Sequence, residues 1–146
     1  MRTILSALAA IGLSMNAMAA DVDFDELKGK VVYLDFWASW CGPCRESFPW
    51  MQEMHERYGE DGLEIIAVNL DQEPYLAKKF LNKYQPTFRI EYDGKGDMAE
   101  EFRVQSMPTS FLIGRDGKAR KKHCGFHADD RASYEDEIRN LLEESE

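Results

Sequence analysis

Cys41 and Cys44, three positions apart, are the residues whose type and spacing most clearly allow chemistry. At the start of a helix, two such side chains lie on one face of the first turn, within the roughly 5.5 Å Cα separation that a disulfide needs. A CxxC pair can also be half of a zinc site or arise by chance. Here Trp40 precedes the pair, a buried-strand pattern leads into it and a helix pattern follows. This context favours a redox-active pair over both alternatives.

The position expected for Cys41, at the N-terminus of a helix, would make it the reactive cysteine. Unpaired backbone N–H groups and the helix dipole stabilise a thiolate there, so the pKa of Cys41 should lie below its ordinary value. Cys44, one turn further on, lacks these donors and should be more shielded. We therefore expect Cys41 to attack a substrate disulfide and Cys44 to resolve the mixed disulfide. Gly42 leaves room for a substrate chain, and Pro43 suits the first helical turn.

The scaffold for these cysteines is predicted by the hydrophobic pattern, which alternates between strand and helix periods. Strands are expected over residues 31–36, 64–69, 88–92, 110–114 and 119–124. Helices are expected from the cysteine motif to about residue 58, over 73–84 and 97–102, and from about 129. A helical crossover implies that the first two strands pair in parallel, whereas Asp116 and Gly117 predict a terminal hairpin. The order β-α-β-α-β-α-β-β-α defines an α/β protein.

The first nineteen residues have the layout of a secretory signal peptide. Arg2 supplies a positive start, residues 4–13 are apolar, and Ala17-Met18-Ala19 offers a small-residue cleavage site. The apolar run is too short for a comfortable membrane span, although an uncleaved anchor is the alternative. We expect a signal peptide at 1–19, cleaved after Ala19, and one domain at 20–146. The mature form should be periplasmic, without stable membrane insertion.

The composition is acidic, with 27 Asp and Glu against 18 Lys and Arg and a formal net charge of −9. Nucleic acids and anionic lipids need basic surface, so neither is expected as a partner. Three cysteines do not form the even-numbered framework of a disulfide-stabilised protein. Cys124 is therefore interpreted separately. A small buried hydrophobe is the commonest fate of a lone cysteine, and the alternatives are an exposed thiol or metal binding with His123 or His127.

Two segments resemble the thioredoxin superfamily. Residues 35–45, DFWASWCGPCR, closely resemble its active-site segment, and residues 106–109, SMPT, resemble the segment that carries a cis-proline beside the disulfide. The stretch between Asp71 and Met107 resembles the insertion of the TlpA/ResA-like branch of exported thiol-disulfide proteins. This resemblance implies a thioredoxin fold with a central mixed sheet, helices on both faces and an αβ insertion.

The resemblance also implies a substrate-binding surface. Pro108 would be cis, which in this superfamily exposes the backbone of Met107 to a substrate strand. A plain turn proline is the alternative. Residues of the cysteine motif would contribute to the same surface, namely Trp40, Gly42 and Pro43.

Asp35 occupies the place of the buried acid of cytosolic thioredoxins, six residues before Cys41. Desolvation should raise the pKa of a carboxyl group there, and it could then take and return the proton of the Cys44 thiol. The alternative is a hydrogen-bonded structural residue. The exported branch often has Asn at this place. Two further positions nearby also depart from the family patterns. Ser47 replaces an acid of the exported branch, and Ala67 replaces a lysine of thioredoxin.

These features predict a periplasmic protein disulfide reductase, or thiol-disulfide interchange protein. It would act through the Cys41–Cys44 disulfide, with no other cofactor and no metal. Gly-Pro between the cysteines is typical of reducing thioredoxins. Expected partners are protein disulfide or dithiol substrates and a membrane electron-delivery protein that re-reduces the pair, with cytochrome c maturation as one candidate pathway. The alternatives are an oxidase with the same fold, or a metal-binding chaperone that adds Cys124 or a histidine.

Overall fold

The computed structural model describes residues 20–144, so the predicted signal peptide at 1–19 lies outside the described residues. The strands are β1 (Val31–Trp37), β2 (Leu63–Asn69), β3 (Arg89–Tyr92), β4 (Thr109–Ile113) and β5 (Ala119–Cys124). The helices are α1 (Cys44–Tyr58), α2 (Pro74–Tyr84), α3 (Asp97–Glu101) and α4 (Arg131–Glu143), with short 3-10 turns at Gly59–Asp61 and Ala128–Asp130. This is the predicted order. Across the described part of the chain, no helix has the length and apolar character needed to cross a membrane.

The five strands form one mixed sheet in the order β3-β2-β1-β4-β5. β1 pairs in parallel with β2, and β2 with β3, because the helical crossovers α1 and α2 return the chain in the same direction. β4 runs antiparallel to both β1 and β5. The central strand β1 is buried at every position, as expected of a strand with neighbours on both sides. The mixed sheet of the predicted thioredoxin fold is confirmed.

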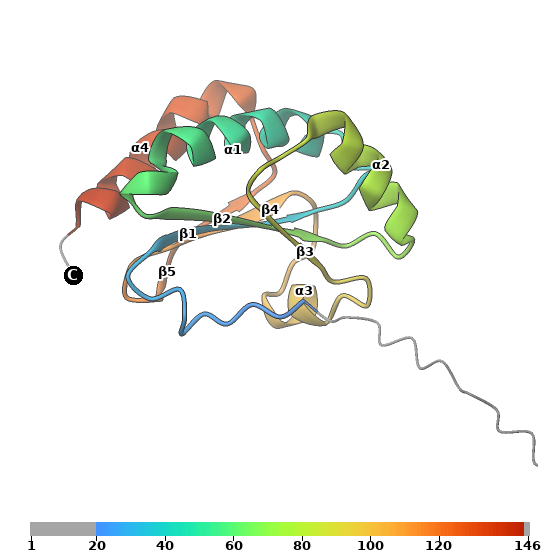
Figure 1. Cartoon of the computed structure of the whole chain (residues 1–146), viewed down its shortest axis with the longest axis horizontal. Coiled ribbons are helices and arrows are strands. Elements are labelled where there is room, and N and C mark those ends of the chain that lie inside the picture. Colours follow the sequence, from blue (N-terminus) through green and yellow to red (C-terminus); the bar gives the residue numbers. More distant parts are fainter. Residues whose placement is uncertain (1–19, 145–146) are drawn as a thin grey trace, which may run out of the picture.

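Helices cover both faces of this sheet. In Figure 1, α1, α2 and α4 lie along one face and α3 lies on the other. Side chains of β1 alternate between the two cores. Tyr33 and Trp37 belong to the core under α1, α2 and α4, whereas Leu34 and Phe36 belong to the core on the α3 side. Asp35 alternates in phase with Tyr33 and Trp37, so its side chain faces the α1 side of the sheet.

A cluster of aromatic side chains packs α1 and α2 against the end of β1. The ring centroid of Trp37 lies 4.6 Å from that of Phe48 in α1 and 4.7 Å from that of Phe80 in α2. Phe48 and Phe80 are themselves 4.8 Å apart, and Tyr84 packs 4.4 Å from Phe80. Such tilted and edge-on pairs add to the stabilisation from burial alone. The cluster fixes the chain on both sides of the loop that carries the cysteines.

Candidate active site

The structure joins Cys41 and Cys44 in a disulfide whose Cα atoms are 5.3 Å apart. Both belong to the core cluster beneath α1, and the exposed fraction is 3% for Cys41 and 0% for Cys44. The outer cysteine is therefore the more accessible of the two, although both are largely buried in the disulfide form. The expected division of roles, in which Cys41 reacts first and Cys44 resolves the mixed disulfide, stays a prediction.

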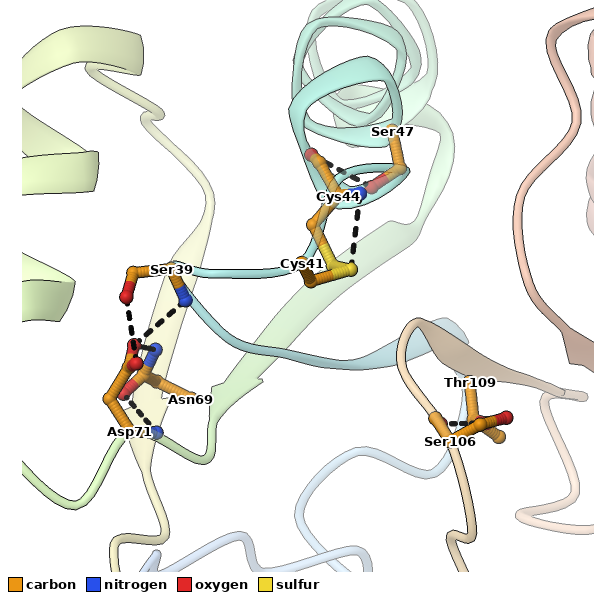
Figure 2. Close-up of a disulfide and its surroundings, with 8 residues drawn as sticks. All are labelled: Ser39, Cys41, Cys44, Ser47, Asn69, Asp71, Ser106 and Thr109. Carbon is orange, nitrogen blue, oxygen red and sulfur yellow. Dashed lines mark hydrogen bonds between the residues drawn. A yellow bond between two sulfur atoms is a disulfide. The ribbon is translucent and has the colours of Figure 1, made fainter.

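The helix begins later than predicted, at Cys44 with Pro43 as its N-cap, so Cys41 lies in the turn before it. The ring of Pro43 fixes the backbone at a helical φ of −62°, and α1 therefore starts there. The sulfur of Cys41 still accepts a hydrogen bond from the N–H of Cys44 at 3.3 Å (Figure 2). One helix N-terminal donor thus reaches the sulfur, which is the contact that stabilises a thiolate.

A hydrogen-bonded group on the neighbouring strand holds the turn before the cysteines (Figure 2). The backbone N–H and the hydroxyl of Ser39 donate to the two carboxylate oxygens of Asp71, at 2.9 and 2.8 Å. The side-chain amide of Asn69 donates to the same carboxylate at 2.8 Å, and its oxygen accepts from the N–H of Asp71 at 3.1 Å. Asp71 thereby links the end of β2 to the active-site loop.

This Ser39–Asp71–Asn69 group was not predicted from the sequence. A signal was present, because Asn69 ends and Asp71 follows a buried strand that pairs in parallel with β1, and the carboxyl ends of parallel strands meet at one edge. Polar residues placed there are positioned to contact the loop that leaves the neighbouring strand.

Asp35 is 2% exposed in the middle of β1, between Ala67 of β2 and Ser110 of β4. Desolvation raises its pKa well above the ordinary value for a carboxyl group. Its Oδ2 atom has no hydrogen-bond partner among the described residues. Ser47 is also buried, and its hydroxyl donates to the backbone carbonyl of Cys44 at 3.2 Å.

The second predicted segment lies just before β4. The peptide bond between Met107 and Pro108 is cis, as expected. The hydroxyl of Thr109 donates to the carbonyl of Ser106 at 2.7 Å (Figure 2), and the carbonyl of Pro108 accepts the N–H of Gly125 at 2.7 Å. The segment is therefore held from within and from the end of β5. Met107 remains half-buried.

The remaining predicted contact residues of the cysteine motif are at the surface. Gly42 and Pro43 are exposed, and Trp40 has an exposed fraction of 67%. All three therefore lie where a substrate chain could reach them, and their role in binding stays a prediction.

Cys124 is exposed, and the favoured prediction that it is buried is wrong. It ends β5, which is the edge strand of the sheet and whose residues are almost all exposed; among the described residues only β4 pairs with it. His123 lies 2.7 Å from Glu137. Over residues 20–144, no three His, Cys, Asp or Glu side chains are grouped so as to hold a metal ion.

Comparison with known proteins places the chain beside thiol-disulfide proteins. Residues 6–138 match the Redoxin family model. Thiol-disulfide oxidoreductase ResA of Bacillus thuringiensis subsp. konkukian (strain 97-27) is 39% identical over 97 residues, which are 66% of this chain and 56% of ResA. The chain thus spans little more than half the length of this relative.

Two crystal structures extend the likeness to the fold. A Chlorobium tepidum protein provisionally assigned as the thiol:disulfide interchange protein DsbE has a TM-score of 0.80 and 46% identity, over 83% of this chain and 86% of that chain. StoA of Bacillus subtilis has a TM-score of 0.64 and 30% identity, over 73% of this chain and 82% of that chain.

Proposed function

Because this chain belongs to the Redoxin family and has a thioredoxin fold, we propose that it is a thiol-disulfide oxidoreductase that reduces disulfides in other proteins. The observation that carries the proposal is the Cys41–Cys44 disulfide at the start of α1, with the Cys41 sulfur accepting a helix N–H and Cys44 fully buried. The ResA relative is named a thiol-disulfide oxidoreductase, which is the same chemistry.

In the proposed reaction, the Cys41 thiolate attacks one sulfur of the client disulfide. A mixed disulfide forms and one client cysteine leaves as a thiolate. Cys44 then gives up its proton and attacks the Cys41 sulfur, which releases the second client thiolate and leaves the Cys41–Cys44 disulfide. Two electrons pass from the protein to the client. Asp35 is the proposed acceptor of the Cys44 proton, because a buried carboxyl group with a raised pKa is better matched to a thiol than an exposed one.

The proposed setting is the periplasm, reached through a signal peptide cleaved after Ala19. Since no thiol buffer would recharge a reductase there, the oxidised pair would be reduced again by a membrane electron-delivery protein. The proposed direction rests on Gly42 and Pro43, the dipeptide of reducing thioredoxins. Such proteins have potentials of about −270 mV, against about −120 mV for a strong oxidant.

The test combines the potential of the pair with cysteine variants. Equilibration against a thiol redox buffer should give a reduction potential of about −270 mV, and a potential of about −120 mV would reverse the proposed direction of electron flow. Cys41→Ser should abolish reduction of a protein disulfide, whereas Cys44→Ser should accumulate a mixed disulfide through Cys41. Cys124→Ser is the matched control and should keep wild-type turnover. A Cys41→Ser protein that still reduced the client at the wild-type rate would refute the assignment of Cys41.

A further inference from the structure

We propose that a positively charged groove beside the disulfide binds an acidic segment of the client polypeptide, next to the client disulfide. This inference deepens the proposed function and rests on it. The groove is a cavity of about 440 Å³ between the active-site loop and α2. Its cationic rim consists of Arg45, Lys79 and Lys83, and its apolar wall includes Phe80 and Tyr84.

The groove adjoins the reactive pair through two of its lining residues. Ser39 lies two positions before Cys41, and Arg45 directly follows Cys44. A polypeptide whose disulfide reached Cys41 would therefore extend over the groove within a few residues. The volume falls in the roughly 300–1,000 Å³ range of binding cavities, enough for side chains and not only for a single ion.

The charge of the groove contrasts with that of the whole chain. The protein carries a formal net charge of −9, yet no Asp or Glu is among the residues that line the cavity. In the described part of the chain, none of Arg45, Lys79 and Lys83 forms an ion pair with a carboxylate. Arg57 and Arg89, by contrast, each hold a carboxylate at 2.6 Å. The rim thus offers three uncompensated positive charges to a ligand.

Asp71, the carboxylate bound to Ser39, is not among the residues that line the groove and forms no ion pair with its rim in the described part of the chain. Asp71 is buried, and both of its side-chain oxygens accept hydrogen bonds from Ser39. The wall adds aromatic surface, because Phe80 is part of the core and the ammonium group of Lys83 lies 5.3 Å from the ring centroid of Tyr84. A cationic rim over an aromatic wall fits a segment in which an acidic side chain stands beside an apolar one.

The experiment compares three disulfide-bonded peptides that differ only beside the cysteine, where they carry Glu-Leu, Gln-Leu or Lys-Leu. The reduced wild-type protein should reduce the Glu peptide with a kcat/KM about tenfold above that for the Gln peptide, because opposite charges speed encounter. The Lys peptide should be the slowest. Raising the salt concentration should shrink the preference, since both partners are exposed charges.

Lysine variants test whether the preference for the Glu peptide comes from the groove. In the double variant Lys79→Gln, Lys83→Gln, the ratio of kcat/KM for the Glu and Gln peptides should fall most of the way to one, since two of the three rim charges are gone. The matched control is Lys78→Gln, Lys121→Gln, which removes the same charge from exposed lysines outside the groove, one of them on α2 itself. This control should keep the wild-type ratio. An equal loss of the ratio in both double variants would overturn the inference and leave only an effect of net charge.

A titration that needs no turnover separates the inference from the proposed function. The oxidised protein is titrated with a cysteine-free peptide bearing the Glu-Leu sequence while backbone amide signals are followed by NMR. The largest shifts are expected at Arg45, Lys79 and Lys83. Shifts confined to β5, or no binding, would contradict the proposal that the groove binds the acidic segment. If the titration succeeds and none of the disulfide peptides is reduced, the redox function fails while the groove stands as a binding site.

Discussion

The Asp35 carboxyl group combines deep burial with an oxygen that has no partner among the described residues. Ionisation there is unfavourable, so the pKa is higher in the folded protein than in the unfolded chain. When the pH exceeds the pKa of Asp35 in the unfolded chain, the folded state still holds a proton that the unfolded state has lost. Stability must therefore fall as the pH rises from about 4 toward the folded pKa. Above the folded pKa the penalty is constant.

Asp35→Asn should accordingly stabilise the protein at neutral pH. Because the amide cannot ionise, it escapes the free-energy cost that the raised pKa of Asp35 imposes on folding, so the free energy of unfolding is expected to rise by about 1–3 kcal/mol. The gain should disappear below about pH 4, where the wild-type carboxyl group is protonated in both states. Urea unfolding from pH 3 to 8 measures it, with the exposed Glu60→Gln as control. A gain independent of pH would contradict the assigned ionisation.

The residues that perform the proposed chemistry could be named from the sequence, because local patterns carry them. Cys41 and Cys44 have a spacing that a helix turn imposes, and Asp35 stands at a fixed offset from them. Whether Cys124 is buried or exposed could not be predicted in the same way. It depends on whether anything covers β5, and that is decided by the arrangement of the whole sheet.

At the scale of elements, the end of β2 positions the active-site loop. Asp71 accepts two hydrogen bonds from Ser39 and one from Asn69, so its carboxylate holds the last turn before Trp40. The contact crosses from one parallel strand to the next, over 32 positions of the chain between Ser39 and Asp71. Sequence patterns specify each strand, but they do not specify which side chains meet where two strands end. The group was therefore missed, although both strands were predicted.

Asp71→Ala should lower the free energy of unfolding by about 2–4 kcal/mol, because it leaves buried donors without an acceptor. The loop should also open locally, so backbone hydrogen exchange at Ser39 should accelerate relative to the centre of β1. The neighbouring Gln72→Ala, at an exposed position, is the control and should change neither quantity. Unchanged exchange at Ser39 in Asp71→Ala would show that the carboxylate does not hold the loop.

At the scale of the whole molecule, one side chain joins segments from both ends of the described chain. The guanidinium of Arg115, in the turn between β4 and β5, donates to the carbonyls of Gly29 at 2.7 Å, Asp61 at 3.2 Å and Leu142 at 3.0 Å. These carbonyls lie before β1, before β2 and near the end of α4. Gly62 permits the approach, since a Cβ there would lie 2.9 Å from the Arg115 Nη1 atom.

Arg115→Met keeps much of the apolar stem but removes all three donors. We expect the free energy of unfolding to fall by about 2–4 kcal/mol, as charge-assisted bonds to three backbone carbonyls are lost. Urea unfolding should show a lower midpoint with an unchanged slope. Lys118→Met, at an exposed position of the same turn, is the control and should stay close to wild type. Equal effects of the two substitutions would exclude the bridging role.

The order of the elements and the parallel start of the sheet were predicted in full, because periods of two and 3.6 residues alternate cleanly along the chain. The connections made by Arg115 were beyond prediction. They require the segment before β1, the 3-10 turn before β2 and the end of α4, which are far apart in sequence, to meet at one corner, and the position of that corner follows only from the packed sheet and α4.

The exposed Cys124 also gives the protein a natural attachment point for a reporter group. In the oxidised form the other two cysteines of the chain are tied to each other, so a thiol-directed fluorophore or spin label would attach at a single position. That position pairs with Thr109, beside the cis-proline segment, and the next residue holds the carbonyl of Pro108. Client docking could then be followed spectroscopically in the unmutated protein.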